Sequence, residues 1–374
     1  MYDVIILGAG GVGSAALFHL ARRGFRVLGL DRFPPGHKRG SSHGQTRAIR
    51  QAYFEHPDYV PLLLRAYDLW EELQALRERR LYNPVGLLEI GPPEGSVVPN
   101  VLQAAAKHQL AVQSLSRQEV AERFPGFVLP ENCAAVFEQQ AGYLLVEECV
   151  MAHAELAQQH GAELAIGEAV ASWAPIDGAV QVRTASQTYL GKQLVIAAGA
   201  WAGEMLADCG FSLRVLRKHL HWCANEDARY QQENGAPVFL YETPQGVYYG
   251  FPHFDRRGLK VAMHSGGETL DATRDNLLNT SREVDPQERR QVEQFLQAHL
   301  PGVSQQPIDH ESCFYTMSAD EHFVIDRHRR AENVWFAAGL SGHGFKFASV
   351  LGEVLADLCE HGRTELPIEF LRRR

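Results

Sequence analysis

The sequence predicts an α/β protein with a mostly parallel sheet in one domain and an antiparallel sheet in a second domain. Three observations support this class. A short apolar run, Asp3–Leu7, leads directly into a glycine-rich turn. The same strand-to-glycine junction recurs at Gln193–Trp201 and Asn333–Gly339. Between residues 213 and 317 polar and apolar residues alternate, which indicates strands with one covered face.

The glycine-rich turn Gly8–Gly13 separates the first strand from a helix expected over Ser14–Arg23. Gly8 permits the tight turn, Gly10 lets the backbone approach a pyrophosphate, and Gly13 lets the helix pack closely on the strand. A second apolar strand, Phe25–Leu30, ends at Asp31, where a carboxylate can accept hydrogen bonds from a ribose. This order is the Rossmann dinucleotide-binding fingerprint. Because a carboxylate repels a 2′-phosphate, the nucleotide is NAD or FAD.

Composition and charge restrict the function further. The 374 residues are 45% hydrophobic and 22% charged, which is typical of a soluble protein of one or two domains. A net charge of −9 argues against nucleic-acid and anionic-membrane partners. No apolar stretch reaches the ~18 residues of a membrane span, and the chain opens in a core strand, so we expect no signal peptide and a cytoplasmic location. The six cysteines have no C-x-x-C spacing, so we expect neither a metal site nor a disulfide framework.

The remaining elements follow from periodicity. Helical spacing predicts a long helix over 59–80, another over 147–160, and shorter ones over 101–108 and 118–124. A short strand is expected over 86–90, and alternating strands over 213–222, 246–251 and 259–264. The chain therefore leaves the nucleotide domain and returns to it. We assign residues 1–85, 145–212 and 320–374 to the nucleotide domain, and residues 86–144 and 213–319 to a substrate domain.

Two further glycine-rich segments carry cations. Ser41–Arg50 suits contact with a phosphate, a flavin or a substrate carboxylate. Leu340–Phe347 places Lys346 at the start of the last helix, where it opposes the helix dipole and calls for an anionic partner. Lys260 and His264 are four apart on an alternating strand and so share one face. The alternatives are a solvated loop for Ser41–Arg50, a plain turn for Leu340–Phe347, and a solvent-facing strand for Lys260 and His264.

Taken together, these segments resemble the monomeric sarcosine oxidase / N-methyltryptophan oxidase family, a branch of the D-amino-acid-oxidase-like flavoenzymes. The matching motifs extend along almost the whole chain. They are Gly8–Gly13, Ser42–Arg47 with Arg50, Tyr59–Leu62, Tyr248–Pro252, Leu259–Lys260 with His264, Cys313–Thr316, Asp320–Asp326 and Gly339–Phe347.

The resemblance implies FAD as the cofactor, tethered through a thioether to Cys313. It implies oxidation of a secondary amine, typically an N-methyl amino acid, to an imine that hydrolyses to formaldehyde and the primary amino acid. Oxygen then reoxidises the flavin and yields hydrogen peroxide. The implied partners are a small amino-acid substrate and oxygen, and the implied state is a monomer.

The same resemblance assigns roles to individual residues. Arg50 and Lys346 hold the substrate carboxylate, and Lys260 lies over the flavin and speeds electron transfer to oxygen. Three residues orient the amine: His264, Tyr249 and Tyr315. Two residues pack against the flavin: His43 and Arg47. The expected cofactor contacts are Gly8, Gly10, Gly13, Asp31, Ser42, Thr46, Gly199, Cys313, Gly342, Gly344, Phe345 and Lys346.

Some positions depart from the family pattern and leave the substrate open. Ser42 stands where the family has the first histidine of a pair, and His219 and His221 stand where relatives are more apolar. A fructosyl-amino-acid oxidase and a cyclic imino-acid oxidase are rivals on the same scaffold. A flavin-binding protein without turnover is a rival of another class. A NAD-dependent dehydrogenase would leave Cys313 and the segment after Gly339 without a use.

Overall fold

The first sheet forms from the apolar strands that the sequence predicts. In the computed structural model, which describes residues 1–373, five strands pair in parallel in the order β20-β12-β1-β2-β9. Their bounds are β1 Tyr2–Leu7, β2 Val27–Asp31, β9 Glu163–Ile166, β12 Thr188–Ile196 and β20 Val334–Ala338. Antiparallel strands extend this sheet: β10 Val170–Ile176, β11 Ala179–Thr184 and β19 Val324–Arg327.

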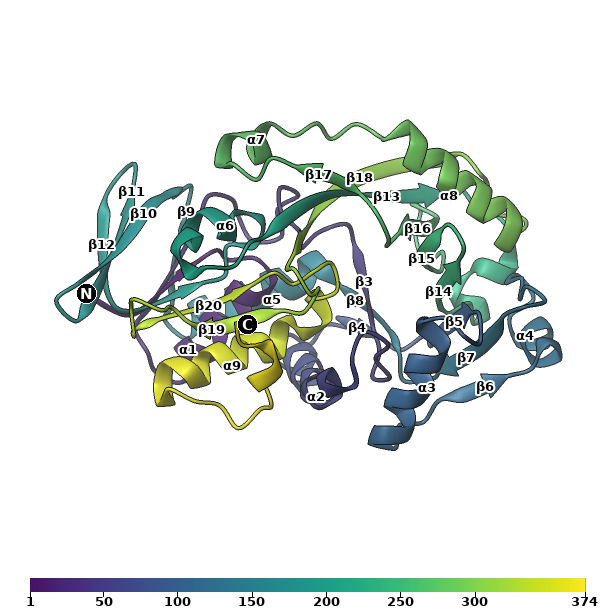
Figure 1. Cartoon of the computed structure of the whole chain (residues 1–374), viewed down its shortest axis with the longest axis horizontal. Helices are drawn as coiled ribbons and strands as arrows, with labels where there is room; N and C mark the ends of the chain where they lie inside the picture. Colours follow the sequence, from purple (N-terminus) through teal and green to yellow (C-terminus); the bar gives the residue numbers. More distant parts are fainter. Residues whose placement is uncertain (374) are drawn as a thin grey trace.

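Helices pack on the sheet through a shared apolar core. Helix α1 (Gly11–Arg22) contacts both α5 (Val146–Gln159) and α9 (Ala348–His361), and α9 also contacts α2 (Val60–Leu76). Figure 1 shows α1, α9 and α2 together below strands β19 and β20. The approach of α1 to α9 is close, because a Cβ at Gly352 would lie 2.5 Å from that of Ala15. The glycine turn at the start of α1 is therefore held on a rigid layer.

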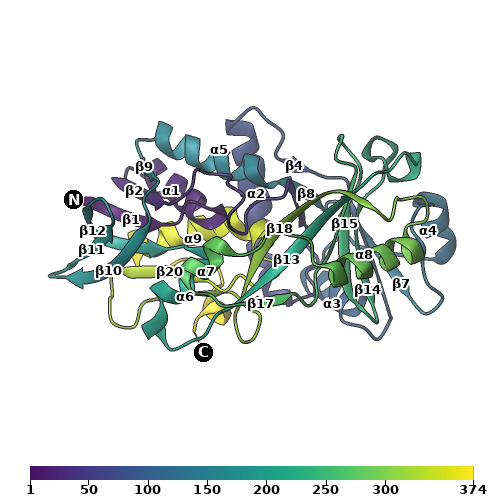
Figure 2. The ribbon, with the colours of Figure 1, turned by 90° about the horizontal axis from the view of Figure 1, so that it is seen from above.

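The second sheet is mainly antiparallel, as the alternation predicts. Its strands follow the order β17-β13-β16-β15-β14-β5-β7-β6, and β18 pairs with β13. The bounds are β5 Leu87–Gly91, β6 Gln113–Leu115, β7 Ala134–Glu138, β13 Arg214–Cys223, β14 Val238–Thr243, β15 Gly246–Phe251, β16 Leu259–Met263, β17 Glu268–Leu270 and β18 Pro307–Met317. The long strands β13 and β18 of this sheet extend toward the first sheet in both views (Figures 1 and 2).

A small third sheet and several short helices complete the chain. The third sheet has the order β3-β8-β4, with β3 Thr46–Ile49, β4 Tyr82–Asn83 and β8 Gly142–Leu145. The remaining α-helices are α3 Val97–His108, α4 Arg117–Arg123, α6 Ala202–Met205, α7 Arg274–Asn279 and α8 Pro286–His299. The 3₁₀ helices are Pro57–Tyr59, Gly199–Trp201, Ala207–Cys209, Ala228–Tyr230, Gln232–Asn234, Phe345–Phe347 and Glu369–Leu371. Within residues 1–373, no helix combines the length and hydrophobicity that a membrane crossing requires.

The predicted elements form, with shifts of a few residues at their ends. The helix expected over 59–80 is α2, which stops at Leu76 and is preceded by a 3₁₀ turn. All strands of the first sheet lie in the ranges assigned to the nucleotide domain, and all strands of the second sheet lie in the other ranges. Strand β8 crosses the expected boundary at residue 145, so the division into two domains stays a prediction.

Candidate active site

A cavity runs from the glycine turn after β1 to the inner face of the second sheet. Its lining includes fourteen of the residues that the sequence singled out. They are Gly8, Gly10, Asp31, Ser42, Arg47, Arg50, Gly199, Tyr249, His264, Tyr315, Gly342, Gly344, Phe345 and Lys346. Five further predicted residues lie close by without being part of the lining: Gly13, His43, Thr46, Lys260 and Cys313.

The turn at Gly8–Gly13 is built to receive a phosphate. Gly8 has φ +96°, and a Cβ there would lie 2.5 Å from the Ala197 carbonyl oxygen. A Cβ at Gly13 would lie 1.8 Å from the Gly8 carbonyl oxygen, so only glycine allows α1 to start this close to β1. Helix α1 begins without a side-chain cap on its N-cap residue, Gly10. Its N-terminus therefore offers backbone N–H groups and the positive end of its dipole to an anion.

Asp31 lies at the end of β2, on the wall of the same cavity. Its carboxylate accepts hydrogen bonds from the Ala9 N–H (2.7 Å) and the Phe33 N–H (2.9 Å). Ser42 reaches the turn from the other side, where its hydroxyl accepts a hydrogen bond from the Gly11 N–H at 3.1 Å. The residues therefore fit the adenosine diphosphate part of a dinucleotide, with an anion seat and an acidic group in the expected order.

Cys313 lies on β18, beside Arg47 of strand β3. Its Sγ is 3.9 Å from Nη2 of Arg47, whose guanidinium also donates to the carbonyl oxygens of Thr46 and Ser41. Burial raises the pKa of the Cys313 thiol, and the Arg47 guanidinium opposes this rise. A cation next to a buried thiol favours its thiolate form, which is the reactive nucleophile.

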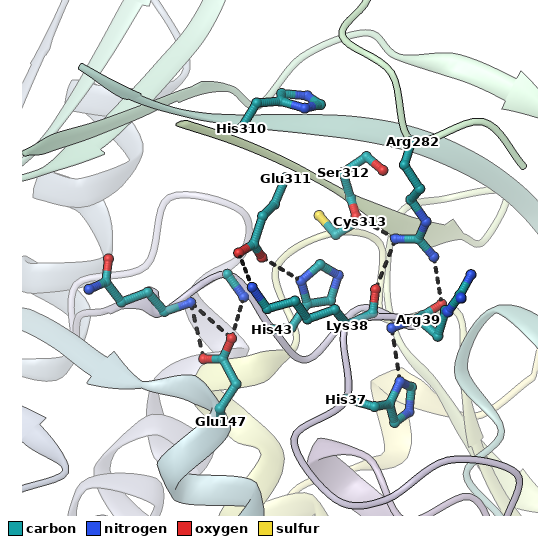
Figure 3. Close-up of polar contacts among 12 residues, drawn as sticks. His37, Lys38, Arg39, His43, Glu147, Arg282, His310, Glu311, Ser312 and Cys313 are labelled. Carbon is teal, nitrogen blue, oxygen red and sulfur yellow. Dashed lines mark hydrogen bonds and ion pairs between the residues drawn. The ribbon is translucent and has the colours of Figure 1, made fainter. Parts of the chain in front are cut away.

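His43 contacts the carboxylate of Glu311, which lies on the same side of β18 as Cys313 (Figure 3). Its Nδ1 lies 3.1 Å from Glu311, which also accepts a hydrogen bond from Lys38 at 2.6 Å. Burial opposes ionisation of Glu311, but the hydrogen bonds from His43 and Lys38 hold the pKa of this carboxyl well below its usual range. Glu147 accepts hydrogen bonds from the N–H groups of Gly44 and Gln45, so the loop backbone is fixed as well.

Arg50 and Lys346 meet at the far end of the cavity with a carboxylate that the sequence analysis did not identify. Nη2 of Arg50 lies 2.9 Å from both carboxylate oxygens of Glu55. Burial opposes ionisation of Glu55, but Arg50 and nearby cations lower the pKa of Glu55 to about 2. Nζ of Lys346 donates to the carbonyl oxygen of His343 at 2.8 Å and to the Tyr53 hydroxyl at 3.3 Å. Burial, with Arg50 second, lowers the pKa of Lys346 to about 7.

A second buried carboxyl stands behind Arg50. Glu89 lies 3.6 Å from Nε of Arg50, and neither of its oxygens has a hydrogen-bond partner within residues 1–373. Burial raises the pKa of Glu89 to about 8, so the group is largely neutral at pH 7. The pocket thus holds two cationic groups and one ionised carboxylate. No periodicity or motif points to Glu55 or Glu89, because their carboxyl groups reach Arg50 only through the fold.

The wall opposite Arg50 is aromatic. Nδ1 of His264 lies 3.3 Å from the Tyr315 hydroxyl, and the His264 ring lies 6.3 Å from the ring of Tyr249. Burial lowers the pKa of His264 to about 3, so its imidazole is neutral. Gly342 has φ +80°, and a Cβ there would lie 2.2 Å from the Tyr315 ring, so this turn fixes the wall in place.

Lys260 is buried against the backbone of residues 44–46. Its Nζ donates to the carbonyl oxygens of Gly44 (2.5 Å) and Thr46 (2.9 Å) and to the Thr46 hydroxyl (3.2 Å). Phe251 and Trp222 lie on either side, with ring centroids 4.8 and 5.3 Å from the ammonium nitrogen. Burial, with Arg47 second, lowers the pKa of Lys260 well below its usual range. The three acceptors match the three N–H groups of a charged lysine.

Comparisons with known proteins agree with this geometry. The family described as FAD dependent oxidoreductase (DAO) matches residues 3–358. Monomeric sarcosine oxidase of Arthrobacter sp. (strain TE1826) is 38% identical over 372 residues, which cover 99% of this chain and 95% of that protein. N-methyl-L-tryptophan oxidase of Yersinia pestis (strain Pestoides F) is 37% identical over 356 residues, 95% of this chain and 94% of that protein.

Solved structures share the same fold. A variant of NikD, described as an unusual amino acid oxidase essential for nikkomycin biosynthesis, matches with a TM-score of 0.87 and 25% identity over 100% of this chain and 97% of that one. Fructosamine oxidase from Aspergillus fumigatus matches with a TM-score of 0.81 and 21% identity over 99% and 89% of the two chains, which shows the fold alone. The chain belongs to the DAO family of FAD-dependent oxidoreductases, and its sequence groups it with the monomeric sarcosine oxidases and N-methyl-L-tryptophan oxidases.

Proposed function

We propose that this protein is an FAD-dependent oxidase of N-methyl or other secondary α-amino acids, giving an imine and hydrogen peroxide. The charge of the inner pocket carries the proposal. Below pH 7 Arg50 and Lys346 bring two positive charges, because the pKa of Lys346 is about 7, and Glu55 compensates one of them. A substrate carboxylate neutralises the remaining positive charge of the pocket, whereas an amine without a carboxylate does not. A buried pocket of this kind selects ligands that carry one anionic group.

The aromatic wall of His264, Tyr249 and Tyr315 can bind the amine end of the substrate. His264 is neutral, so its imidazole can accept a hydrogen bond from an amine N–H. Tyr249 and Tyr315 give the pocket an apolar surface against which an N-methyl group can pack. A carboxylate fixed at one end and an amine fixed at the other hold the C–H bond of the substrate in one orientation.

The residues that would hold FAD are those of the glycine turn, Asp31, the loop after Ser41 and the segment after Gly339. FAD would supply the acceptor for the hydride, which carries both electrons away from the amine. We also propose that Cys313 carries the flavin through a thioether, supported by its place beside Arg47. Acid-precipitated protein should then stay yellow, and Cys313→Ser should release FAD into the supernatant. A colourless wild-type pellet would refute the tether.

We assign Lys260 to the reaction with oxygen. Its Nζ is buried under residues 44–46, where two carbonyl oxygens and the Thr46 hydroxyl accept from the three N–H groups of the protonated form. In a water-excluded site such a charge stabilises the negative charge that develops on oxygen during reduction. The expected partners are therefore a small amino acid and oxygen, and we propose that the protein works as a monomer in the cytoplasm.

Anaerobic mixing of the flavin-loaded protein with candidate substrates tests the function. Sarcosine and N-methyl-L-tryptophan should bleach the flavin, and air should restore its colour with release of peroxide. Bleaching by fructosyl-glycine or proline alone would move the assignment to a deglycating or a cyclic imino-acid oxidase. No bleaching by any of these amines would indicate a flavin-binding protein without turnover.

A further inference from the structure

His264 lies where the second sheet is interrupted. Strand β13 pairs with β16 at residues 221–223 and with β17 at residues 215–217. The three residues of β13 in between lie opposite six residues of the neighbouring segment, 262–267. Strand β16 ends before His264, and residues 264–267 form a turn that belongs to neither strand. This β16–β17 turn therefore carries the His264 imidazole, which is part of the cavity lining.

Two sets of hydrogen bonds hold the β16–β17 turn. In the first, the His264 N–H donates to the Val247 carbonyl oxygen at 2.7 Å, and the Ser265 hydroxyl accepts from the Val247 N–H at 2.9 Å. In the second, Nζ of Lys218 donates to the carbonyl oxygens of Ser265 (2.8 Å) and Gly266 (3.2 Å). Because the strand pairing of β13 stops short of these two residues, the lysine takes the place of a strand partner.

Lys218 lies on the side of β13 that faces the cavity. Its neighbours on that side of the strand, Leu216 and Leu220, pack in one apolar cluster with Cys313 and Tyr315. Cys313 is also its direct partner in the pairing of β13 with β18. The lysine is buried, but it is not part of the cavity lining. It therefore stands behind the wall of the pocket, within reach of the residues that form it.

The turn packs closely on Lys218, and burial of this side chain has a cost. Gly267 has φ +117°, and a Cβ there would lie 3.0 Å from Cδ of Lys218. Among residues 1–373 no carboxylate forms an ion pair with the lysine, and burial lowers the pKa of Lys218 against the weaker effects of Glu288 and Cys313. A buried amino group without a counter-ion lowers the stability of the fold. What the lysine provides is therefore a fixed position of the turn.

Lys218 also contacts a second residue of the aromatic wall. Its Nζ lies 5.6 Å from the centroid of the Tyr315 ring. The Tyr315 hydroxyl and Nδ1 of His264 are 3.3 Å apart, so one amino group acts on both members of this contact. Burial is the main cause of the low pKa of His264, and a protonated Lys218 lowers it further, whereas Glu55 opposes both. The lysine thus favours the neutral imidazole as well as its position.

We propose that Lys218 is a positioning residue for amine binding: it holds the β16–β17 turn and the Tyr315 ring, so that the His264 imidazole stays where the substrate amine binds. The inference rests on the proposed function, which assigns the amine to His264. Because Lys218 is not part of the cavity lining, it acts through His264 and Tyr315 and not by touching the substrate. Arg50 and Lys346, at the opposite end of the substrate, should not depend on it.

Anaerobic stopped-flow with flavin-loaded variants tests the proposal, using sarcosine or N-methyl-L-tryptophan, whichever reduces the wild-type flavin. Lys218→Met should lower the limiting rate of flavin reduction about 10- to 100-fold, because a misplacement of about 1 Å is enough for such a loss. The Kd of acetate, which needs only the carboxylate end of the pocket, should change less than about twofold. Lys218→Arg can donate to both carbonyl oxygens and should recover most of the rate. Lys192→Met, at an exposed lysine, should match the wild type.

Two further measurements test whether Lys218 acts through His264. In a His264→Ala background, Lys218→Met should slow flavin reduction less than about threefold, because both changes then affect one group. Hydrogen exchange measured by mass spectrometry should be faster at residues 264–268 in Lys218→Met than in the wild type, whether or not an amine reduces the flavin.

Three results would overturn the proposal. They are equal rate losses with and without His264, unchanged hydrogen exchange in Lys218→Met, and faster exchange with no loss of rate, which would limit Lys218 to the stability of the turn. Wild-type flavin that neither amine reduces would instead refute the proposed function. If Lys218→Met does not retain flavin, Lys218→Gln, which keeps a hydrogen-bond donor, replaces it in every measurement.

Discussion

Replacing Lys346 by methionine should make the protein more stable while it weakens substrate binding. The side chain is buried, and burial together with Arg50 lowers the pKa of Lys346 to about 7. A lysine in the unfolded chain has its ordinary pKa of 10.5. Below pH 7 Lys346 is therefore charged in the folded protein, and burial of this charge lowers the stability of the fold. Methionine removes the charge and keeps a side chain of similar length.

The magnitude follows from the shift. A fall from 10.5 to about 7 corresponds to about 4–5 kcal/mol at 1.36 kcal/mol per pKa unit. Methionine also loses the hydrogen bonds to Tyr53 and the His343 carbonyl oxygen, a loss of about 1–2 kcal/mol that the Tyr53 hydroxyl limits by donating to the same carbonyl. The variant should therefore be about 2–4 kcal/mol more stable than the wild type at pH 6.5.

The dependence on pH separates this effect from packing. Between pH 7 and 10.5 the unfolded wild type binds more protons at Lys346 than the folded protein, so wild-type stability rises with pH relative to the variant. The advantage of the variant should shrink by about 2–3 kcal/mol between pH 6.5 and 9. Urea unfolding of both flavin-loaded proteins at the two pH values measures it. A variant that is less stable at both, by a constant amount, would refute the reasoning.

Three further predictions concern other parts of the site. Glu55→Gln frees Arg50 from its carboxylate partner and should tighten binding of a carboxylate ligand about tenfold, measured by flavin spectral shifts with acetate. Gly13→Ala places a Cβ 1.8 Å from the Gly8 carbonyl oxygen and should abolish FAD binding, whereas Gly203→Ala, with open space around it, should keep full flavin content. Lys260→Met should slow reoxidation of the reduced flavin about 10²–10³-fold in stopped-flow, and exposed Lys192→Met should not change it.

Much of the fold could be predicted because its signals are local. Apolar runs that end in glycine, as at Leu7–Gly8 and Ala338–Gly339, predict buried strands of a parallel sheet. The alternation of residues 213–222 likewise predicts one strand of the antiparallel sheet. The hairpin β10–β11 was not predicted: β10 is largely exposed, and the short alternation of β11, which buries Val180 and Val182, was overlooked.

Site residues that belong to a sequence motif could be predicted. Residues that join the site only through contacts in the folded chain could not. Arg50 and Lys346 are singled out by their segments, but Glu55 lies outside both and matters only because its carboxylate reaches Arg50.

The rate of anaerobic flavin reduction by amines with and without a carboxylate tests most directly whether Arg50 binds the substrate carboxylate. Sarcosine and N-methylethylamine are compared in the wild type and in Arg50→Met by stopped-flow. The wild type should strongly prefer sarcosine. Arg50→Met should lose roughly 2–5 kcal/mol, about 30-fold or more, in kcat/KM for sarcosine and almost nothing for the carboxylate-free amine. Equal losses on both amines would contradict the account, because they would show that Arg50 serves the flavin or the fold.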